Sequence, residues 1–216
     1  MEIKVLKNIL SANEEIAQRN RKLLDSGGVF TVNLMSSPGA GKTSLVLETI
    51  KALKGKTRIG VIEGDLSSSV DAETISKENV PVIQINTGGG CHLDANMISK
   101  ALSNLPLEGI ELLLIENVGN LVCPAGFALG EHKKVLISSI PEGDDKPLKY
   151  PLMFHEVDAV LINKIDLLPY LKFDTQAFSQ AVRGINGKVE IFQISCATGQ
   201  GIQEWVSWLL NQMNQR

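Results

Sequence analysis

The stretch SSPGAGKT, residues 36–43, decides the fold because it follows a short apolar run and opens a helix-like run. The apolar run covers residues 29–35, and the helix-like run covers residues 44–53. A strand, a glycine-rich loop and a helix in this order form the phosphate-binding loop of many nucleotide-binding proteins. Successive backbone N–H groups between Gly39 and Thr43 can converge on phosphate oxygens. The stretch therefore predicts a nucleoside triphosphate site.

Two side chains of this loop complete the expected chemistry. Lys42 supplies a positive charge for the β- and γ-phosphates, and the hydroxyl of Thr43 is suited to bind magnesium. The usual pattern begins with glycine, where Ser36 stands here, but Gly39 and Gly41 keep the flexible backbone that the loop needs. The residues predicted to contact the nucleotide in this loop are Ser37, Pro38, Gly39, Ala40, Gly41, Lys42, Thr43 and Ser44.

The composition is that of an ordinary globular protein. The 216 residues suit one large domain, and 44% apolar residues with 21% charged residues allow a buried core. A net charge of −3 gives no reason to expect nucleic acid or an anionic membrane as a partner. No apolar run is long enough to span a bilayer, and residues 1–7 lack the apolar core of a signal peptide. Three cysteines without framework spacing favour a reducing cytoplasm.

Strands and helices alternate along the chain, which predicts an α/β fold of three layers, a P-loop NTPase with a mostly parallel central sheet flanked by helices. We expect residues 1–28 to form a helix that packs on a single domain, residues 29–216. Strands are expected at residues 29–35, 58–63, 81–86, 110–116, 134–140, 159–163 and 189–194. Helices are expected at residues 2–26, 44–53, 67–77, 93–102, 174–182 and 202–213, with residues 142–147 as a loop.

The stretch NKID, residues 163–166, indicates which base is bound. The carboxylate of Asp166 can accept hydrogen bonds from N1–H and the amino group of guanine, and adenine has neither donor in that place. Lys164 can lie over the ring face, and Asn163 can brace the loop. A backbone N–H for guanine O6 is expected, from position alone, in the loop formed by Ser195, Cys196 and Ala197.

Two acidic residues stand at the carboxyl ends of expected strands, where open parallel sheets bind ligands. Asp65 follows the second strand, and Glu116 ends the nearly all-apolar fourth strand. Either carboxylate can hold magnesium or orient the attacking water. The stretch ENVG, residues 116–119, is similar to the D-x-x-G of many GTPases, so Gly119 is expected beside the γ-phosphate. We therefore predict catalytic roles for Lys42, Asp65 and Glu116.

Two loops carry sulfur and imidazole groups. Cys91 and His92 follow a run of three glycines, residues 88–90, and Cys123 lies just beyond the expected γ-phosphate contact. We expect the two loops to leave neighbouring strands of the sheet. Two thiolates and an imidazole suit zinc or nickel, but the spacing alone is equally compatible with a buried cysteine and a helix-capping histidine. Three ligands also leave a fourth position for water, another side chain or a second subunit.

Taken together, these motifs resemble the HypB family of GTPases, which help to deliver nickel to nickel–iron hydrogenase. The resemblance rests on SSPGAGKT (36–43), EGD (63–65), TGGGCHLDA (87–95), IENVGNLVCPA (115–125), EGDDKPLKYP (142–151) and NKID (163–166). It implies a slow, magnesium-dependent cytoplasmic GTPase that binds GTP or GDP and dimerises with nucleotide. Its implied partners are nickel-carrier and hydrogenase large-subunit maturation proteins. The resemblance also implies that Cys91, His92 and Cys123 bind nickel or zinc, and that Lys146 reaches the nucleotide of a partner subunit.

Other functions are compatible with parts of the pattern. GTPases for urease nickel insertion and for cobalamin-enzyme maturation share several motifs, although the urease proteins usually carry Cys-Pro-His where Ala125 follows Pro124 here. A nucleotide-gated metal-binding module with negligible turnover would use the same residues. A small-molecule kinase is the third alternative, and residues 163–166 argue against it because a kinase has no use for a guanine reader.

Overall fold

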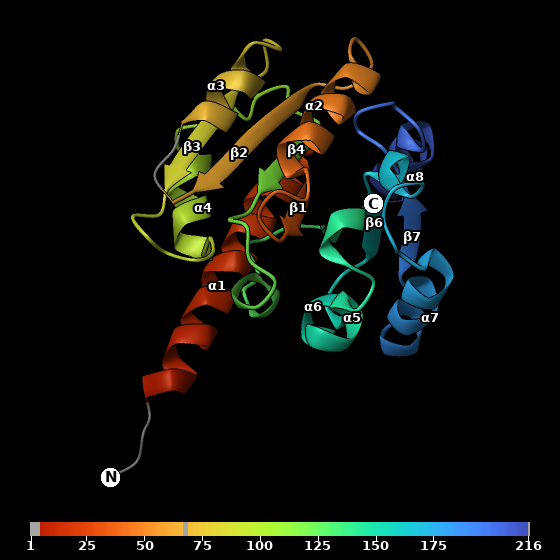
Figure 1. The fold of residues 1–216 in the computed structure, drawn as a ribbon. Coiled ribbons are helices and arrows are strands. Elements are labelled where there is room, and N and C mark those ends of the chain that lie inside the picture. Colours follow the sequence, from red (N-terminus) through yellow and green to blue (C-terminus); the bar gives the residue numbers. More distant parts are fainter. Residues whose placement is uncertain (1–4, 67–68, 216) are drawn as a thin grey trace.

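The computed structural model describes residues 5–66 and 69–215, which form one sheet of seven parallel strands flanked by helices (Figure 1). The strand order across the sheet is β3-β2-β4-β1-β5-β6-β7. The strands are β1 (Phe30–Ser36), β2 (Ile59–Asp65), β3 (Val82–Asn86), β4 (Leu112–Glu116), β5 (Lys133–Ser139), β6 (Ala159–Asn163) and β7 (Glu190–Gln193). This confirms the predicted α/β class and the parallel sheet.

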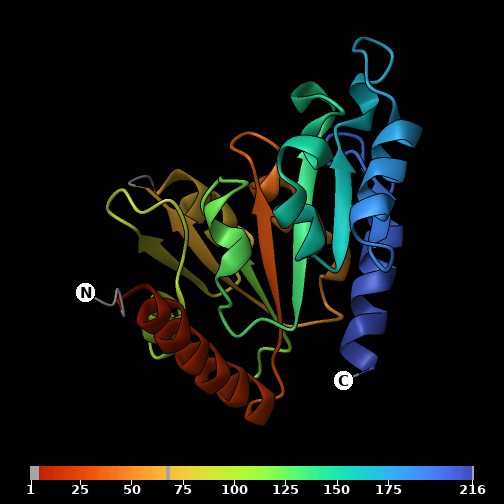
Figure 2. The same cartoon turned by 90° about the horizontal axis from the view of Figure 1, so that it is seen from below.

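The helices are α1 (Val5–Ser26), α2 (Lys42–Leu53), α3 (Val70–Ser76), α4 (Ala95–Leu102), α5 (Lys146–Lys149), α6 (Pro151–His155), α7 (Thr175–Ile185) and α8 (Ile202–Asn214). Single turns of 3-10 helix are η1 (Cys123–Gly126), η2 (Ile140–Glu142) and η3 (Ile165–Leu167). Among the described helices, none is both long and apolar enough to cross a bilayer. Figure 2 shows the blue helices α7 and α8 beside the β7 end of the sheet, with α1, in red, away from them toward the other end.

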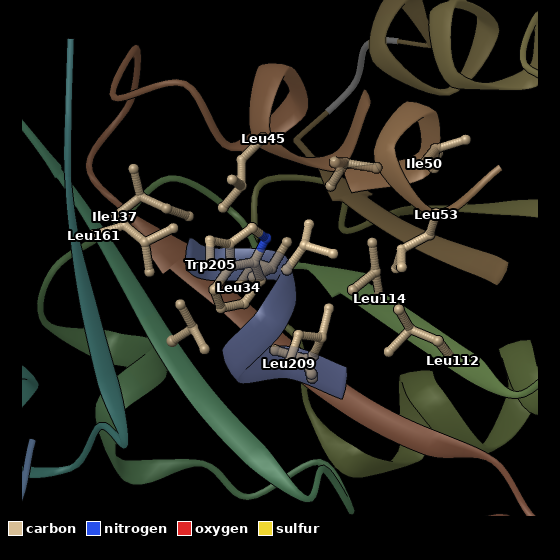
Figure 3. Close-up of a cluster of buried hydrophobic side chains, with 14 of the residues drawn as sticks. Leu34, Leu45, Ile50, Leu53, Leu112, Leu114, Ile137, Leu161, Trp205 and Leu209 are labelled. Carbon is tan, nitrogen blue, oxygen red and sulfur yellow. The ribbon is translucent and has the colours of Figure 1, made fainter. Parts of the chain in front are cut away.

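Helices cover both faces of the sheet, and this explains why its central strands are apolar throughout. Every residue of β1, β4 and β6 is buried, as expected for parallel strands with helices on both faces. On one face, α2, α3 and α8 pack around Trp205, which lies among Leu34, Leu45 and Leu209 (Figure 3). The indole N–H of Trp205 donates to the hydroxyl of Thr49 at 2.9 Å, so this buried donor is satisfied.

The opposite face carries α1, α4, α6 and α7. Leu24 of α1 and Ile98 of α4 pack there against Ile62 and Leu113 of the sheet, and Phe178 of α7 packs in a separate cluster beside β5 and β6. The three predicted layers are therefore present as one sheet between two layers of helices, and all strands end at the same edge of the sheet. That edge receives the loops on which the candidate functional residues lie.

The expected elements are present, with boundaries that shift by a few residues. The first three residues of the helix expected at 2–26 and the first two of that expected at 67–77 lie outside the described residues. The expected loop at 142–147 is wrong in part, because η2 ends within it and α5 begins within it, and α6 follows directly. These helices are too short to show a periodic apolar pattern. Each has a proline in its first turn, a position that needs no N–H donor.

Candidate functional site

The predicted phosphate-binding loop lies between a strand and a helix, which is the setting that its sequence predicts. It joins β1 to α2, and Lys42 lies inside it with 9% of the residue exposed. The Lys42 ammonium donates to the hydroxyl of Ser36 at 2.9 Å, so the serine that replaces the usual first glycine holds the lysine in place. Burial lowers the pKa of Lys42, although nearby Glu116 opposes the effect. A phosphate bound beside Lys42 would therefore favour the charged form of its ammonium, which burial disfavours.

Gly41 is a position in this loop where a side chain would not fit. Its φ of 102° lies in the left-handed region, which residues with a Cβ rarely adopt. A Cβ built on Gly41 would lie 2.4 Å from Nδ2 of Asn163. The Asn163 amide donates to the carbonyl of Ala40 at 2.9 Å, and Lys164 Nζ donates to the carbonyl of Gly39 at 2.7 Å. The phosphate loop and the NKID stretch therefore contact each other directly.

The predicted guanine reader is assembled from two loops. The hydroxyl of Ser195 donates to Oδ1 of Asp166 at 2.5 Å, and the N–H of Cys196 donates to Oδ1 of Asn163 at 3.2 Å. Ser195 thus fixes one oxygen of the carboxylate that would read the base. The neighbouring Ala197 continues the same loop. Burial raises the pKa of the Cys196 thiol to about 11, which fits local packing and not metal binding.

A cleft of about 500 Å³ opens beside the phosphate loop. Its wall is made by Pro38, Gly39, Gly41, Lys42, Thr43, Ser44, Asp65, Leu66, Asp71, Glu116, Val118, Gly119 and Lys164. The cleft brings together residues from the loop, from the ends of β2 and β4, and from the NKID stretch. Lys146 is not among the described residues that line this wall, and its ammonium lies 5.5 Å from the centre of the Tyr150 ring.

The acidic end of the cleft is suited to a hard cation. The hydroxyl of Thr43 donates to Oε1 of Glu116 at 2.8 Å, so two predicted magnesium ligands are already in contact. Carboxylate oxygens of Glu63, Asp65 and Asp71 lie within 4.8 Å of one another. Oxygen-rich groups of this kind match the ligand preference of magnesium. The residues therefore fit the cation that the phosphate loop calls for.

Glu63 is a site residue that the sequence reasoning missed. It pairs in register with Glu116 on the adjacent strand, and the two residues are 1% and 3% exposed. Burial raises the pKa of Glu63 to about 8, with a further contribution from Glu116, and burial raises the pKa of Glu116 to about 7. One oxygen of each has no hydrogen-bond partner among the described residues. A charged residue inside the apolar strand IGVIEGD was the available signal.

The three candidate metal ligands meet in space. The Sγ atoms of Cys91 and Cys123 and a ring nitrogen of His92 lie within 4.8 Å of one another. The expectation that their loops leave neighbouring strands is wrong, because β2 lies between β3 and β4. The chain after β3 instead passes over the end of β2, where a Cβ on Gly64 would lie 2.7 Å from the Leu93 side chain.

Burial keeps His92 in its metal-binding form, whereas Cys123 opposes the ionisation of Cys91 until a cation is present. Nδ1 of His92 lies 3.5 Å from Sγ of Cys91, and the His92 ring contacts that of Phe127 at a tilt of 39°, with ring centres 4.1 Å apart. Burial lowers the pKa of His92, so the imidazole is kept neutral, the form that binds metals. The neighbouring Cys123 raises the pKa of Cys91, as expected for two thiols that compete for negative charge. Soft thiolates with imidazole suit nickel or zinc.

Comparisons with known proteins identify the family to which this chain is similar. The family model for the CobW/HypB/UreG nucleotide-binding domain matches residues 30–193. The hydrogenase maturation factor HypB of Azotobacter vinelandii is 49% identical over 215 residues, which cover 99% of this chain and 71% of the relative. HypB of Escherichia coli strain K12 is 48% identical over 205 residues, covering 95% and 71%. The crystal structure of HypB from Helicobacter pylori in complex with nickel is 36% identical, with a TM-score of 0.90 over 94% of this chain and 96% of that chain.

Proposed function

Because this chain belongs to the HypB family of hydrogenase maturation factors, we propose that it is a magnesium-dependent GTPase that delivers nickel for nickel–iron hydrogenase. It would act as a nucleotide-dependent homodimer, together with nickel-carrier and hydrogenase large-subunit maturation proteins. The observation that supports this proposal best is the short segment from Glu116 to Cys123. It begins at the nucleotide cleft and ends at Cys123, one of the three candidate metal ligands.

For the GTPase step, the chain supplies charge and positioning. The backbone N–H groups of the loop and the Lys42 ammonium would hold the β- and γ-phosphates. Thr43, Asp65 and Glu116 would hold magnesium, which neutralises charge that develops on the phosphates. The Asp65 or Glu116 carboxylate would also orient the attacking water, and Gly119 would place its N–H at the γ-phosphate. These groups line one cleft, as in-line transfer requires.

A buried amide supports coupling between the nucleotide and the metal. Oδ1 of Asn117 accepts from the N–H of Leu93 at 3.0 Å and from the N–H of Val118 at 2.9 Å. Leu93 follows His92, and Val118 lines the nucleotide cleft. A movement of residues 116–119 on GTP binding would therefore displace Leu93, the residue next to the candidate metal ligand His92. Coupling of this kind is reciprocal, so nickel would change nucleotide affinity by the same free energy.

The base preference provides a direct test of the GTPase assignment. Asp166→Asn should weaken GTP binding about tenfold to a hundredfold, because a charged hydrogen-bond pair of about 1.5–3 kcal/mol is lost. The same change should improve binding of xanthosine triphosphate, whose extra carbonyl accepts from the new amide. Affinities measured by competition against a fluorescent GDP would show both effects. Equal affinity of the unmodified protein for ATP and GTP would refute the assignment.

The metal assignment is tested by titrating nickel and zinc into the protein with GDP and with a non-hydrolysable GTP analogue. Cys91→Ala and Cys123→Ala should each lose metal while GTP hydrolysis persists, and sedimentation should show a dimer with the analogue. Two chains would bring together two copies of a three-ligand cluster. Metal binding that survives loss of both cysteines, or that ignores the nucleotide, would rule out coupled delivery. The matched control is Cys196→Ala, which removes a thiol that packs against the core.

A further inference from the structure

The buried face of α1 contains two amides where apolar side chains are expected. Asn13, Ala17, Asn20 and Leu24 are all buried and are spaced by four, three and four residues, so they lie on one face of the helix. Burying an amide costs free energy unless its hydrogen bonds are made. Asn13 and Asn20 are 9% and 3% exposed. Their positions therefore call for specific partners.

Both amides bind backbone groups of two segments that are distant in the sequence. Oδ1 of Asn13 accepts from the N–H of Ala95 at 2.9 Å, and its Nδ2 donates to the carbonyl of Ala128 at 2.8 Å. Nδ2 of Asn20 donates to the carbonyl of Ala95 at 2.8 Å and to that of Leu129 at 3.0 Å. Each asparagine thus joins the start of α4 to the chain that follows η1.

These are the two segments that carry the candidate metal ligands. Ala95 follows His92 by three residues, and Ala128 follows Cys123 by five. Between them, the rings of His92 and Phe127 are in tilted contact, with their centres 4.1 Å apart. The two asparagines therefore bridge the segments just behind the cluster without touching its sulfur or nitrogen atoms.

Close packing keeps α1 against the second of these segments. A Cβ on Gly130 would lie 2.7 Å from Cβ of Asn20 and 2.9 Å from the carbonyl oxygen of Ala17. The Nε of Arg21 donates to the Gly130 carbonyl at 2.8 Å. The helix backbone and the segment after η1 are thus in direct contact, which leaves little freedom for one to move past the other.

We propose that Asn13 and Asn20 are positioning residues for nickel, because they hold the Cys91–His92 and Cys123 segments in the arrangement that binds the ion. This inference rests on the proposed metal site. Residues that orient metal ligands from behind typically change affinity tenfold to a hundredfold. Since these asparagines act through the backbone and not on a ligand atom, we expect about a tenfold effect, at the lower end of that range.

The test compares nickel affinity for Asn13→Ala, Asn13→Asp and Asn20→Ala. The matched control is Gln18→Ala, which removes an exposed amide from the same helix. Asn13→Asp keeps an acceptor for the Ala95 N–H but cannot donate to Ala128, so it should weaken nickel as Asn13→Ala does. The thiolate-to-nickel absorption band should change in the three asparagine variants. GDP affinity should stay at the wild-type value, which shows that the nucleotide half of the fold is intact.

The outcomes separate this inference from the proposed function. If Cys91→Ser and Cys123→Ser bind nickel normally, the metal assignment itself is refuted. If those variants lose nickel while Asn13→Ala and Asn20→Ala keep wild-type affinity, only the positioning role is refuted. A measurement on the wild type covers the case in which a variant does not fold. By linkage, nickel should slow hydrogen exchange at the Ala95 N–H, and unchanged exchange would overturn the proposal.

Discussion

Replacing Glu63 by glutamine should stabilise the nucleotide-free protein at alkaline pH. Glu63 is 1% exposed, it lies beside Glu116 in the sheet, and one of its oxygens has no hydrogen-bond partner in the described chain. Burial and the neighbouring carboxylates raise its pKa from 4.5 to about 8. That interval corresponds to up to about 5 kcal/mol of unfolding free energy once the carboxyl is ionised in both states. Glutamine has a similar shape and does not ionise.

The sign of the pH dependence follows from the raised pKa. Below pH 4.5 the carboxyl is protonated in both the folded and the unfolded chain, so Glu63 carries no penalty. Between pH 4.5 and about 8 the unfolded chain loses the proton first, and the unfolding free energy falls as pH rises. Above about pH 8 the penalty is constant. Glu116, with a pKa of about 7, acts in the same direction.

The assay is urea denaturation in EDTA at pH 5 and pH 8.5, without nucleotide. The gain in stability from Glu63→Gln should be several-fold larger at pH 8.5 than at pH 5. Glu108→Gln, at an exposed loop position, serves as the control and should follow the wild type at both values. Magnesium with GDP should reduce the gain in stability that Glu63→Gln gives at pH 8.5, because a cation near Glu63 favours the ionised carboxylate. A gain that is the same at both values, or absent at pH 8.5, would refute the electrostatic reasoning.

Two further predictions concern the phosphate loop. Lys42→Ala should abolish tight GTP binding or hydrolysis, whereas Thr43→Ala should bind nucleotide but lose its dependence on magnesium. Phosphate release at varied magnesium concentration distinguishes the two variants. Wild-type turnover by Lys42→Ala would show that the loop is assigned wrongly. Gly41→Ala should lose nucleotide binding and stability together, because the new Cβ would meet Asn163 at 2.4 Å and require a φ of 102°. Thermal unfolding with and without GDP measures both effects, and Gly184→Ala, where no atom lies within 4 Å of the new Cβ, is the control.

The parts of the site that were predictable depend on short stretches of chain. The phosphate loop needs a fixed order of strand, glycines, lysine and threonine, and in the structure Lys42 contacts Ser36 while Thr43 contacts Glu116. The NKID stretch is similarly local. Its contact with Gly39 and Ala40 forms at the shared edge of the sheet where all strands end, although β5 lies between β1 and β6. The parallel sheet was predictable for a similar reason, because the alternation of strands and helices can be followed along the sequence.

The parts that were missed depend on which strands are neighbours. Strand order cannot be read from periodicity, so β2 was not expected between β3 and β4. Glu63 was missed for the same reason, because its role depends on its position opposite Glu116 on the neighbouring strand. The meeting of Cys91 with Cys123 was anticipated for a wrong reason, because it depends on a crossing over Gly64 and not on adjacent strands.

The buried amides behind the candidate metal ligands bind one another, backbone groups and the buried carboxylate of Glu131, which accepts from Asn33 at 3.3 Å and from the N–H of Leu129 at 2.7 Å. Asn117 donates to Asn33 at 3.2 Å and accepts from Leu93, while Asn13 and Asn20 hold Ala95. A buried charge in these places would require a partner and would alter the field at the thiolates. An amide both donates and accepts without a net charge, so it can fix the backbone and leave the ligands free to respond to the arriving cation. Nickel affinity should therefore depend on the geometry of these amides, and it should fall at low pH as the cysteines and the histidine are protonated.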